Sequence, residues 1–171
     1  AELQFMIGLP DAGLRTTQLT DVLAEHWERF EQFEDALASW DRTQWAGVLT
    51  GFIDLVAYHA ATDRYYIVDW KSNILEATLE SFTDERIAEE MKTHAYFLQY
   101  LFYTVALHQY LSQAVPGYDY DEQFGGAFYL FLRGIDGSTR RAVYADRPAR
   151  ALVEALSTQL GDFANHREGT P

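Results

Sequence analysis

Apolar positions recur along the chain at helical spacing in three stretches. Between residues 17 and 40 they fall three or four positions apart, which predicts an amphipathic helix with acidic residues on its other side. A second helical pattern covers residues 83–112, where Thr83 is the expected N-cap. A third pattern begins at Pro148 and is predicted to end near residue 166.

Strand patterns lie between these helices. Residues 2–9 have strand character and are followed by turn residues. Residues 47–59 and 64–71 are rich in β-branched and aromatic side chains, and the four residues between them suit the turn of an antiparallel hairpin. Residues 126–133 are apolar at successive positions, which is typical of a central strand covered on both faces.

These elements predict one α/β domain over residues 1–171, with a central mixed sheet of at least three strands flanked by helices. The entering strand belongs to residues 1–10, the core of the domain to 47–137 and the C-terminal helix to 148–166. Because the first residues already have strand character, we expect the chain to be a piece of a longer protein.

Composition adds two exclusions and one expectation. An apolar fraction of 48% is typical of a packed globule. The absence of cysteine excludes disulfides and thiolate metal sites. No apolar run approaches the roughly 20 residues that a membrane-spanning helix needs. We therefore expect a cytoplasmic protein without a membrane partner.

The formal net charge of −13 allows two functional interpretations. DNA-binding proteins usually carry a basic surface, because neutralisation of phosphates supplies much of their affinity. Either this domain does not bind nucleic acid, or other parts of a larger assembly deliver a strand to it. Composition alone favours the first interpretation, although a metal site also requires some acidic residues.

Three residues of the predicted hairpin are candidates for chemistry. Asp54 lies among apolar residues of one strand, and Asp69 and Lys71 lie at the end of the other. Side chains two positions apart on a strand share a face, so Asp69 and Lys71 point the same way. If the hairpin pairs as predicted, Asp54 approaches Asp69 across the ladder.

Two carboxylates held together on apolar strands cost free energy unless a positive charge lies between them. A divalent cation such as Mg²⁺ meets that need through oxygen ligands, and Lys71 is placed to help. The lysine could orient a water molecule, deprotonate it, or offset charge on the reacting phosphate. From the residue types alone, a surface salt bridge remains an alternative.

Longer motifs add a family resemblance. The segments GFIDLV, YYIVDWKSN, MKTHAYFLQYLFYTVALHQYL and YDYDEQFGGAFYLFLRG resemble RecB-type nuclease domains of the PD-(D/E)xK superfamily, and ELQFMIGLP is a weaker match. The resemblance implies a restriction-endonuclease-like core and Mg²⁺-dependent hydrolysis of DNA phosphodiester bonds. It further implies an exodeoxyribonuclease within a helicase–nuclease that serves double-strand-break repair by recombination.

The resemblance also assigns roles to residues. It implies that Asp54 and Asp69 are metal ligands, that the main-chain carbonyl of Trp70 binds the same ion, and that Lys71 is the catalytic lysine. These four positions are the predicted catalytic and metal site.

Further site residues follow from the same resemblance. Gln99 and Tyr103 match a Gln-x-x-x-Tyr pattern on one helix face, where they orient the site or the DNA backbone; ordinary helix packing is the alternative. Glu2 matches an acidic position of the preceding strand in the family and is a further candidate site residue. The family also uses a histidine upstream of that strand, outside these 171 residues. We therefore expect the chain alone to cleave weakly or not at all.

The expected partners come from the family as well. They are single-stranded DNA delivered by helicase domains, RecC-type and RecD-type subunits, and the RecA recombinase. The alternative function is a catalytically silent docking module with the same fold, for example one that recruits RecA. Its acidic charge keeps that alternative open, whereas the intact Asp54, Asp69 and Lys71 set favours the enzyme.

Overall fold

The computed structural model describes residues 1–38, 44–73, 81–137 and 141–163. Its strands are β1 (Leu3–Gly8), β2 (Leu14–Arg15), β3 (Gln44–Trp45), β4 (Val48–Ile53), β5 (Leu55–His59), β6 (Arg64–Lys71), β7 (Phe124–Phe131) and β8 (Val143–Asp146). Its helices are α1 (Thr16–His26), α2 (Phe30–Ala38), α3 (Asp84–Thr93), α4 (Tyr96–Ala114), α5 (Tyr120–Gln123) and α6 (Arg150–Leu160), with a 3-10 turn, η2, at Leu132–Gly134.

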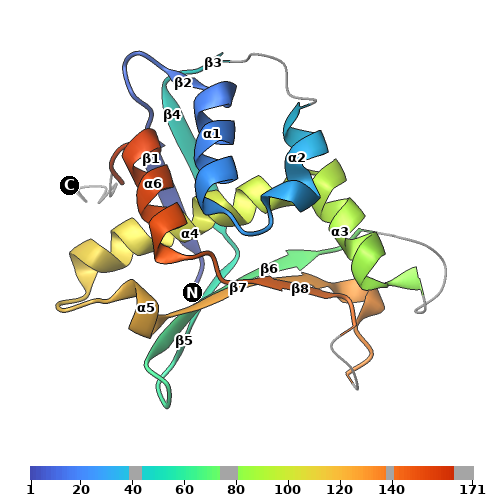
Figure 1. The fold of residues 1–171 in the computed structure, drawn as a ribbon. Coiled ribbons are helices and arrows are strands. Elements are labelled where there is room, and N and C mark those ends of the chain that lie inside the picture. Colours follow the sequence, from blue (N-terminus) through green and yellow to red (C-terminus); the bar gives the residue numbers. More distant parts are fainter. Residues whose placement is uncertain (39–43, 74–80, 138–140, 164–171) are drawn as a thin grey trace, which may run out of the picture.

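A four-stranded mixed sheet in the order β5-β6-β7-β8 forms the centre of the fold (Figure 1). β5 and β6 pair antiparallel as a hairpin, with Leu55 opposite Val68. β7 runs parallel to β6 and places Tyr129 beside Asp69, and β8 returns antiparallel to β7. The predicted hairpin, the central position of the third strand and the α/β class are thus confirmed.

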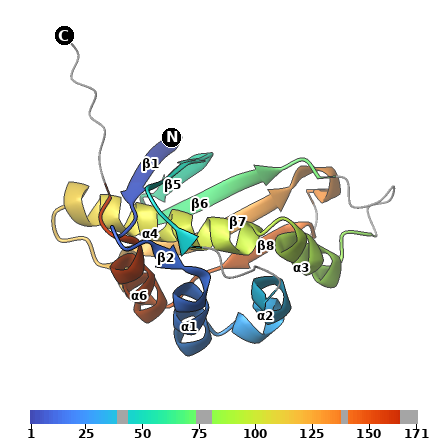
Figure 2. The ribbon, with the colours of Figure 1, turned by 90° about the horizontal axis from the view of Figure 1, so that it is seen from above.

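Helix α4 lies between this sheet and a second layer that contains α1 and α6 (Figures 1 and 2). Eleven of its nineteen residues are buried, because one side of the helix packs on β7 and another on α6. In the described part of the chain, no helix has both the length and the apolar character required to cross a bilayer.

The helix predicted over residues 17–40 is wrong as a single element, because α1 and α2 are separate. The backbone turns extended at Trp27, with φ −106° and ψ 112°. In the link, the Arg29 Nε–H donates to Asp146 Oδ1 at 2.9 Å, and the guanidinium lies 5.3 Å from the ring centroid of Tyr144. These contacts to β8 offset the helical hydrogen bonds lost at the break. Residues 39 and 40 lie outside the described residues.

The helix predicted over residues 83–112 is also two helices. Its N-cap is confirmed, since the Arg86 N–H donates to Thr83 Oγ1 at 3.3 Å. The break comes at Ala95, whose backbone is left-handed with φ 53° and ψ 27°. The two halves pack against different parts of the sheet, because α3 contacts β8 and α4 contacts β7. The change of direction brings Tyr96 to the start of α4.

Three smaller differences concern the strands and the last helix. The strand predicted over residues 47–59 is two strands in different sheets, because β4 pairs with β1 and β5 pairs with β6. The chain changes sheet at Asp54. Strand β8 was not predicted, since four residues carry too short a pattern. Helix α6 begins at Arg150, and residues 164–166 of the predicted helix lie outside the described residues.

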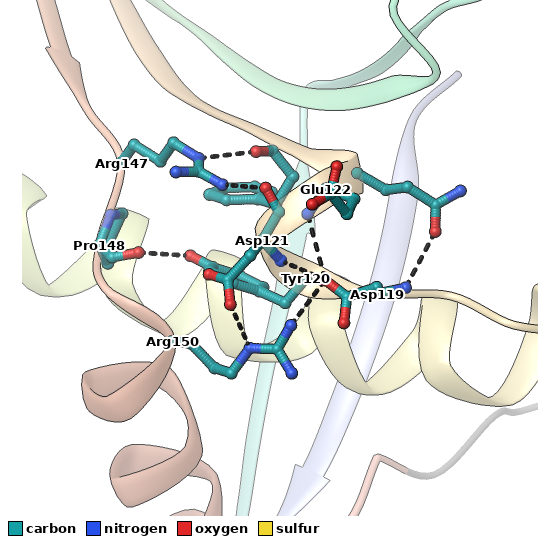
Figure 3. Close-up of polar contacts among 9 residues, drawn as sticks. Asp119, Tyr120, Asp121, Glu122, Arg147, Pro148 and Arg150 are labelled. Carbon is teal, nitrogen blue, oxygen red and sulfur yellow. Dashed lines mark hydrogen bonds and ion pairs between the residues drawn. The ribbon is translucent and has the colours of Figure 1, made fainter.

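A polar cluster ties the start of β7 to the start of α6 (Figure 3). Arg150 makes ion pairs with Asp119 Oδ1 at 2.6 Å and Asp121 Oδ2 at 2.7 Å. The Tyr120 hydroxyl donates to the Pro148 carbonyl at 2.7 Å, and Arg147 Nε–H donates to the Phe124 carbonyl at 2.8 Å. The cluster therefore anchors β7, the neighbour of the strand that carries Asp69.

Candidate active site

Strand β6 presents two of the predicted residues on its buried face. The alternation of side chains along the strand directs Asp69 and Lys71 toward α4, where they are 2% and 9% exposed. Trp70 points to the opposite face and is 45% exposed. Two ionisable side chains are therefore held inside an otherwise apolar layer, which requires compensating contacts.

Asp54 approaches the same place from the junction of β4 and β5. Its Oδ2 accepts a hydrogen bond from the Trp70 N–H at 3.1 Å, which holds the carboxylate against the end of β6. Asp54 is exposed to solvent, whereas Asp69 is buried. The two carboxylates are close enough for the charge of Asp54 to contribute to raising the pKa of Asp69.

Asp69 and Lys71 form a buried ion pair, with 2.7 Å between Lys71 Nζ and Asp69 Oδ2. Burial raises the pKa of Asp69 above its ordinary value, the hydrogen-bonding and charge effects of Lys71 oppose that shift, and Asp54 adds to it. Among the described residues, Asp69 Oδ2 has the distance of an ion pair but no partner with hydrogen-bond geometry. That oxygen retains the capacity to bind a cation.

Helix α4 contributes an amide and a phenol to the site. Gln99 Oε1 accepts from Lys71 Nζ at 2.9 Å and from the Tyr129 hydroxyl at 3.1 Å, and Gln99 Nε2–H donates to the Tyr103 hydroxyl at 2.8 Å. Burial and the charge of Asp69 raise the pKa of Tyr103 to about 12, so its hydroxyl stays protonated at neutral pH. The structure thus brings Gln99 into contact with the lysine and Tyr103 into contact with Gln99, beyond ordinary packing.

Two aromatic residues at the site were not predicted. The Lys71 ammonium lies 3.9 Å from the ring centroid of Tyr96 and 4.9 Å from that of Tyr129. Tyr129 faces Asp69 only through the parallel pairing of β6 and β7, and Tyr96 reaches the lysine only because the helix breaks at Ala95. Residue spacing does not indicate either of these contacts with Lys71, although both tyrosines lie within the motifs that resemble the nuclease family.

The residues present fit a hard divalent cation in the type of their donor atoms. Asp54, Asp69 and the Trp70 carbonyl offer oxygen atoms only, and the buried Asp69 Oδ2 has no hydrogen-bond partner in the part of the chain that the structure describes. Glu2 comes directly before β1, in which Leu3 lies opposite Ile53 of β4. The same antiparallel register, continued by one residue, places Glu2 opposite Asp54. No group of three or more His, Cys, Asp or Glu side chains suited to a metal occurs in the described residues, so Glu2 does not complete a three-carboxylate cluster.

Comparison with protein families identifies the fold around this site. The profile of the PD-(D/E)XK nuclease superfamily matches residues 6–169. The chain belongs to the PD-(D/E)XK nuclease superfamily. The matched range includes Asp54, Asp69 and Lys71, whereas Glu2 precedes it.

Within this nuclease superfamily, the chain is similar to proteins named RecBCD enzyme subunit RecB. It is 48% identical over 110 residues to that of Haemophilus influenzae and 45% identical over 111 residues to that of Escherichia coli, in each case over 64% of the chain. The Mycobacterium tuberculosis protein is 37% identical over 121 residues, or 67% of the chain. The matches span only 9% to 11% of the length of these relatives.

Proposed function

We propose that the chain is the nuclease module of a RecB-type subunit and that it hydrolyses DNA phosphodiester bonds as an Mg²⁺-dependent exodeoxyribonuclease. The observation that supports this function is the convergence of Asp54, Asp69 and Lys71 at one point between β5, β6 and α4. Membership of the nuclease superfamily agrees with that chemistry.

In the proposed site, Asp54 and Asp69 and the Trp70 carbonyl would hold the cation. The bound ion would supply Lewis-acid polarisation of a phosphoryl oxygen and a lower pKa for a bound water. The Trp70 N–H orients Asp54, and β6 rigidly positions Asp69, so little reorganisation accompanies binding. Asp69 must be ionised to bind, and its raised pKa means that a proton competes with the cation more strongly than at a free aspartate.

Lys71 supplies the positive charge on the other side of Asp69. Its ammonium donates to Gln99 Oε1, and the Gln99 amide is oriented by the hydroxyls of Tyr103 and Tyr129. A lysine fixed in this way acts where negative charge develops on the phosphate in the transition state. Orientation of the attacking water by the same ammonium is compatible with this position.

The proposed substrate is single-stranded DNA delivered by helicase domains, in a complex with RecC-type and RecD-type subunits. This delivery accounts for a module with a net charge of −13, which has little electrostatic attraction for phosphates by itself. Repair of double-strand breaks in the cytoplasm, with RecA as a further partner, completes the proposal. The name of the relatives, which assigns them to the RecBCD enzyme, supports the proposed assembly.

The same charge favours a second candidate function, a catalytically silent docking module. One experiment separates the two. Mg²⁺ or Mn²⁺ binding is measured by isothermal titration, together with cleavage of a labelled single-stranded oligonucleotide, for the wild type and for Asp54→Ala/Asp69→Ala. The control is Glu34→Ala/Asp35→Ala, which removes two exposed carboxylates from α2 and changes the net charge equally.

The nuclease proposal expects metal binding and cleavage that are lost together in Asp54→Ala/Asp69→Ala and retained in the control. Binding that survives the first pair of changes would place the metal elsewhere. If the chain alone neither binds nor cleaves, the same variants are measured in the full-length subunit. If the full-length wild-type subunit has no nuclease activity, the result favours the docking function.

A further inference from the structure

Four groups surround the ammonium of Lys71, two of them oxygen atoms and two of them aromatic rings. Asp69 Oδ2 lies at 2.7 Å and Gln99 Oε1 at 2.9 Å. The Tyr96 ring centroid is 3.9 Å from Nζ and the Tyr129 ring centroid is 4.9 Å from it. Tyr96 is thus the nearer aromatic face, and it takes a place that water would fill at an open lysine.

Tyr96 is held in this position by a neighbouring ring and by its own hydroxyl. The His94 ring stacks on it, with 5.2 Å between centroids and 23° between planes. The Tyr96 hydroxyl donates to Asn73 Oδ1 at 3.3 Å, and Asn73 Nδ2–H donates to Glu90 Oε2 at 3.3 Å. The ring is therefore held in place by contacts from α3 and from the end of β6.

The backbone conformation next to Tyr96 also helps to place its ring beside Lys71. Ala95, immediately before it, adopts a left-handed conformation that is unfavourable in a residue with a side chain. Strained backbone of this kind persists where surrounding contacts determine it, and it is concentrated near functional sites. Here it directs the first residue of α4 toward Lys71 instead of continuing α3.

We infer that Tyr96 is a positioning residue for the proposed reaction, and that its ring face sets the direction of the Lys71 ammonium. The inference rests on the proposed nuclease function. Beside the contacts with Asp69 and Gln99, the Tyr96 ring is nearer to the ammonium than the Tyr129 ring, and it limits movement of the ammonium about the Asp69–Gln99 line. The hydroxyl of Tyr96 serves only to hold the ring through Asn73.

The test uses the full-length subunit in its assembled complex, with Mg²⁺ and a labelled single-stranded oligonucleotide. Tyr96→Leu and Tyr96→Met remove the ring, and Tyr96→Phe keeps the ring without the hydroxyl. Tyr110→Leu is the matched control, because it makes the same change in a half-buried tyrosine of the same helix, whose ring packs against Phe163. The rate of acetylation of Lys71, read by peptide mass spectrometry, supplies a measurement independent of cleavage.

For Tyr96→Leu and Tyr96→Met we expect kcat to fall about tenfold to thirtyfold, the range of a desolvated cation–π contact. KM and the Mg²⁺ concentration for half-maximal rate should stay within about twofold, and Lys71 should acetylate faster. Tyr96→Phe and Tyr110→Leu should keep kcat within about twofold. An undiminished kcat without the ring, an equal loss in Tyr96→Phe, a loss confined to KM, or unchanged acetylation would each overturn the inference.

The failure of the proposed function would look different. In that case the wild-type complex would not cleave through this site, or Asp54→Ala/Asp69→Ala would cleave at the wild-type rate. If both of those controls behave as a nuclease site requires and the ring variants retain full kcat, the nuclease stands and only the role of Tyr96 is refuted.

Discussion

Replacement of Gln99 by leucine removes the acceptor on which the interior of the site depends. Its Oε1 takes a hydrogen bond from Lys71 and another from Tyr129, whose side chain is fully buried. Leucine has a comparable size and helix propensity, so α4 itself should persist. The substitution therefore tests the polar contacts of one oxygen atom with little change in packing.

The magnitude follows from the two donors that lose their partner. A hydrogen bond from a charged donor such as Lys71 contributes about 1.5–3 kcal/mol, and an unpaired buried hydroxyl costs about 1–3 kcal/mol. Because both donors share one acceptor, the effects add incompletely. We expect Gln99→Leu to lower the free energy of unfolding by about 3 kcal/mol. In a chain of 171 residues this lowers Tm by roughly 6–12 °C.

The assay is urea unfolding of the purified chain, followed by tryptophan fluorescence and by circular dichroism. Gln113→Leu is the control, since it makes the same change at an exposed position of the same helix. We expect a change of less than about 0.5 kcal/mol there. A loss below about 1 kcal/mol for Gln99→Leu, or an equal loss for Gln113→Leu, would refute the reasoning that these buried donors depend on Gln99.

Two further predictions concern parts of the fold away from the site. Burial lowers the pKa of His108, so the folded state favours the neutral imidazole, and the stability that this contributes is lost as pH falls through that pKa. Between about pH 7.5 and pH 5, the free energy of unfolding should therefore fall more in the wild type than in His108→Gln. An equal fall in both proteins would contradict this prediction. Gly134→Ala should cost about 1–3 kcal/mol by urea unfolding, because its Cβ would lie 2.4 Å from Phe82 Cγ and 2.6 Å from Ala142 Cβ. Gly8→Ala is its control and should change little, because no neighbouring atom of the described residues lies within 4 Å of the added carbon.

The hairpin was predictable because its signals are local. Strand β6 has the predicted bounds, and its two-residue period places Asp69 and Lys71 on one face. The short loop determines that β5 pairs with β6, which brings Asp54 toward the same end. The metal role of these residues remains a prediction, but their proximity required only neighbouring segments of the chain.

The helical regions were less predictable. A periodic apolar pattern reports which side of a helix is buried, and it stays intact when the helix breaks and resumes with the same side inward. This is what happens at Trp27 and at Ala95. Neither residue is a glycine or a proline, so no local breaker marked the change of direction.

The sequence by itself therefore determined the α/β class, the hairpin and the presence of two carboxylates and a lysine near its end, because side-chain alternation and short loops act over a few residues. Tertiary structure decided which groups surround Lys71. Gln99, Tyr96 and Tyr129 come from two turns of one helix and a parallel strand, and their contacts span 25 to 58 residues of sequence. Such contacts depend on how α4 crosses the sheet, which is a property of packing between layers and not of any local pattern.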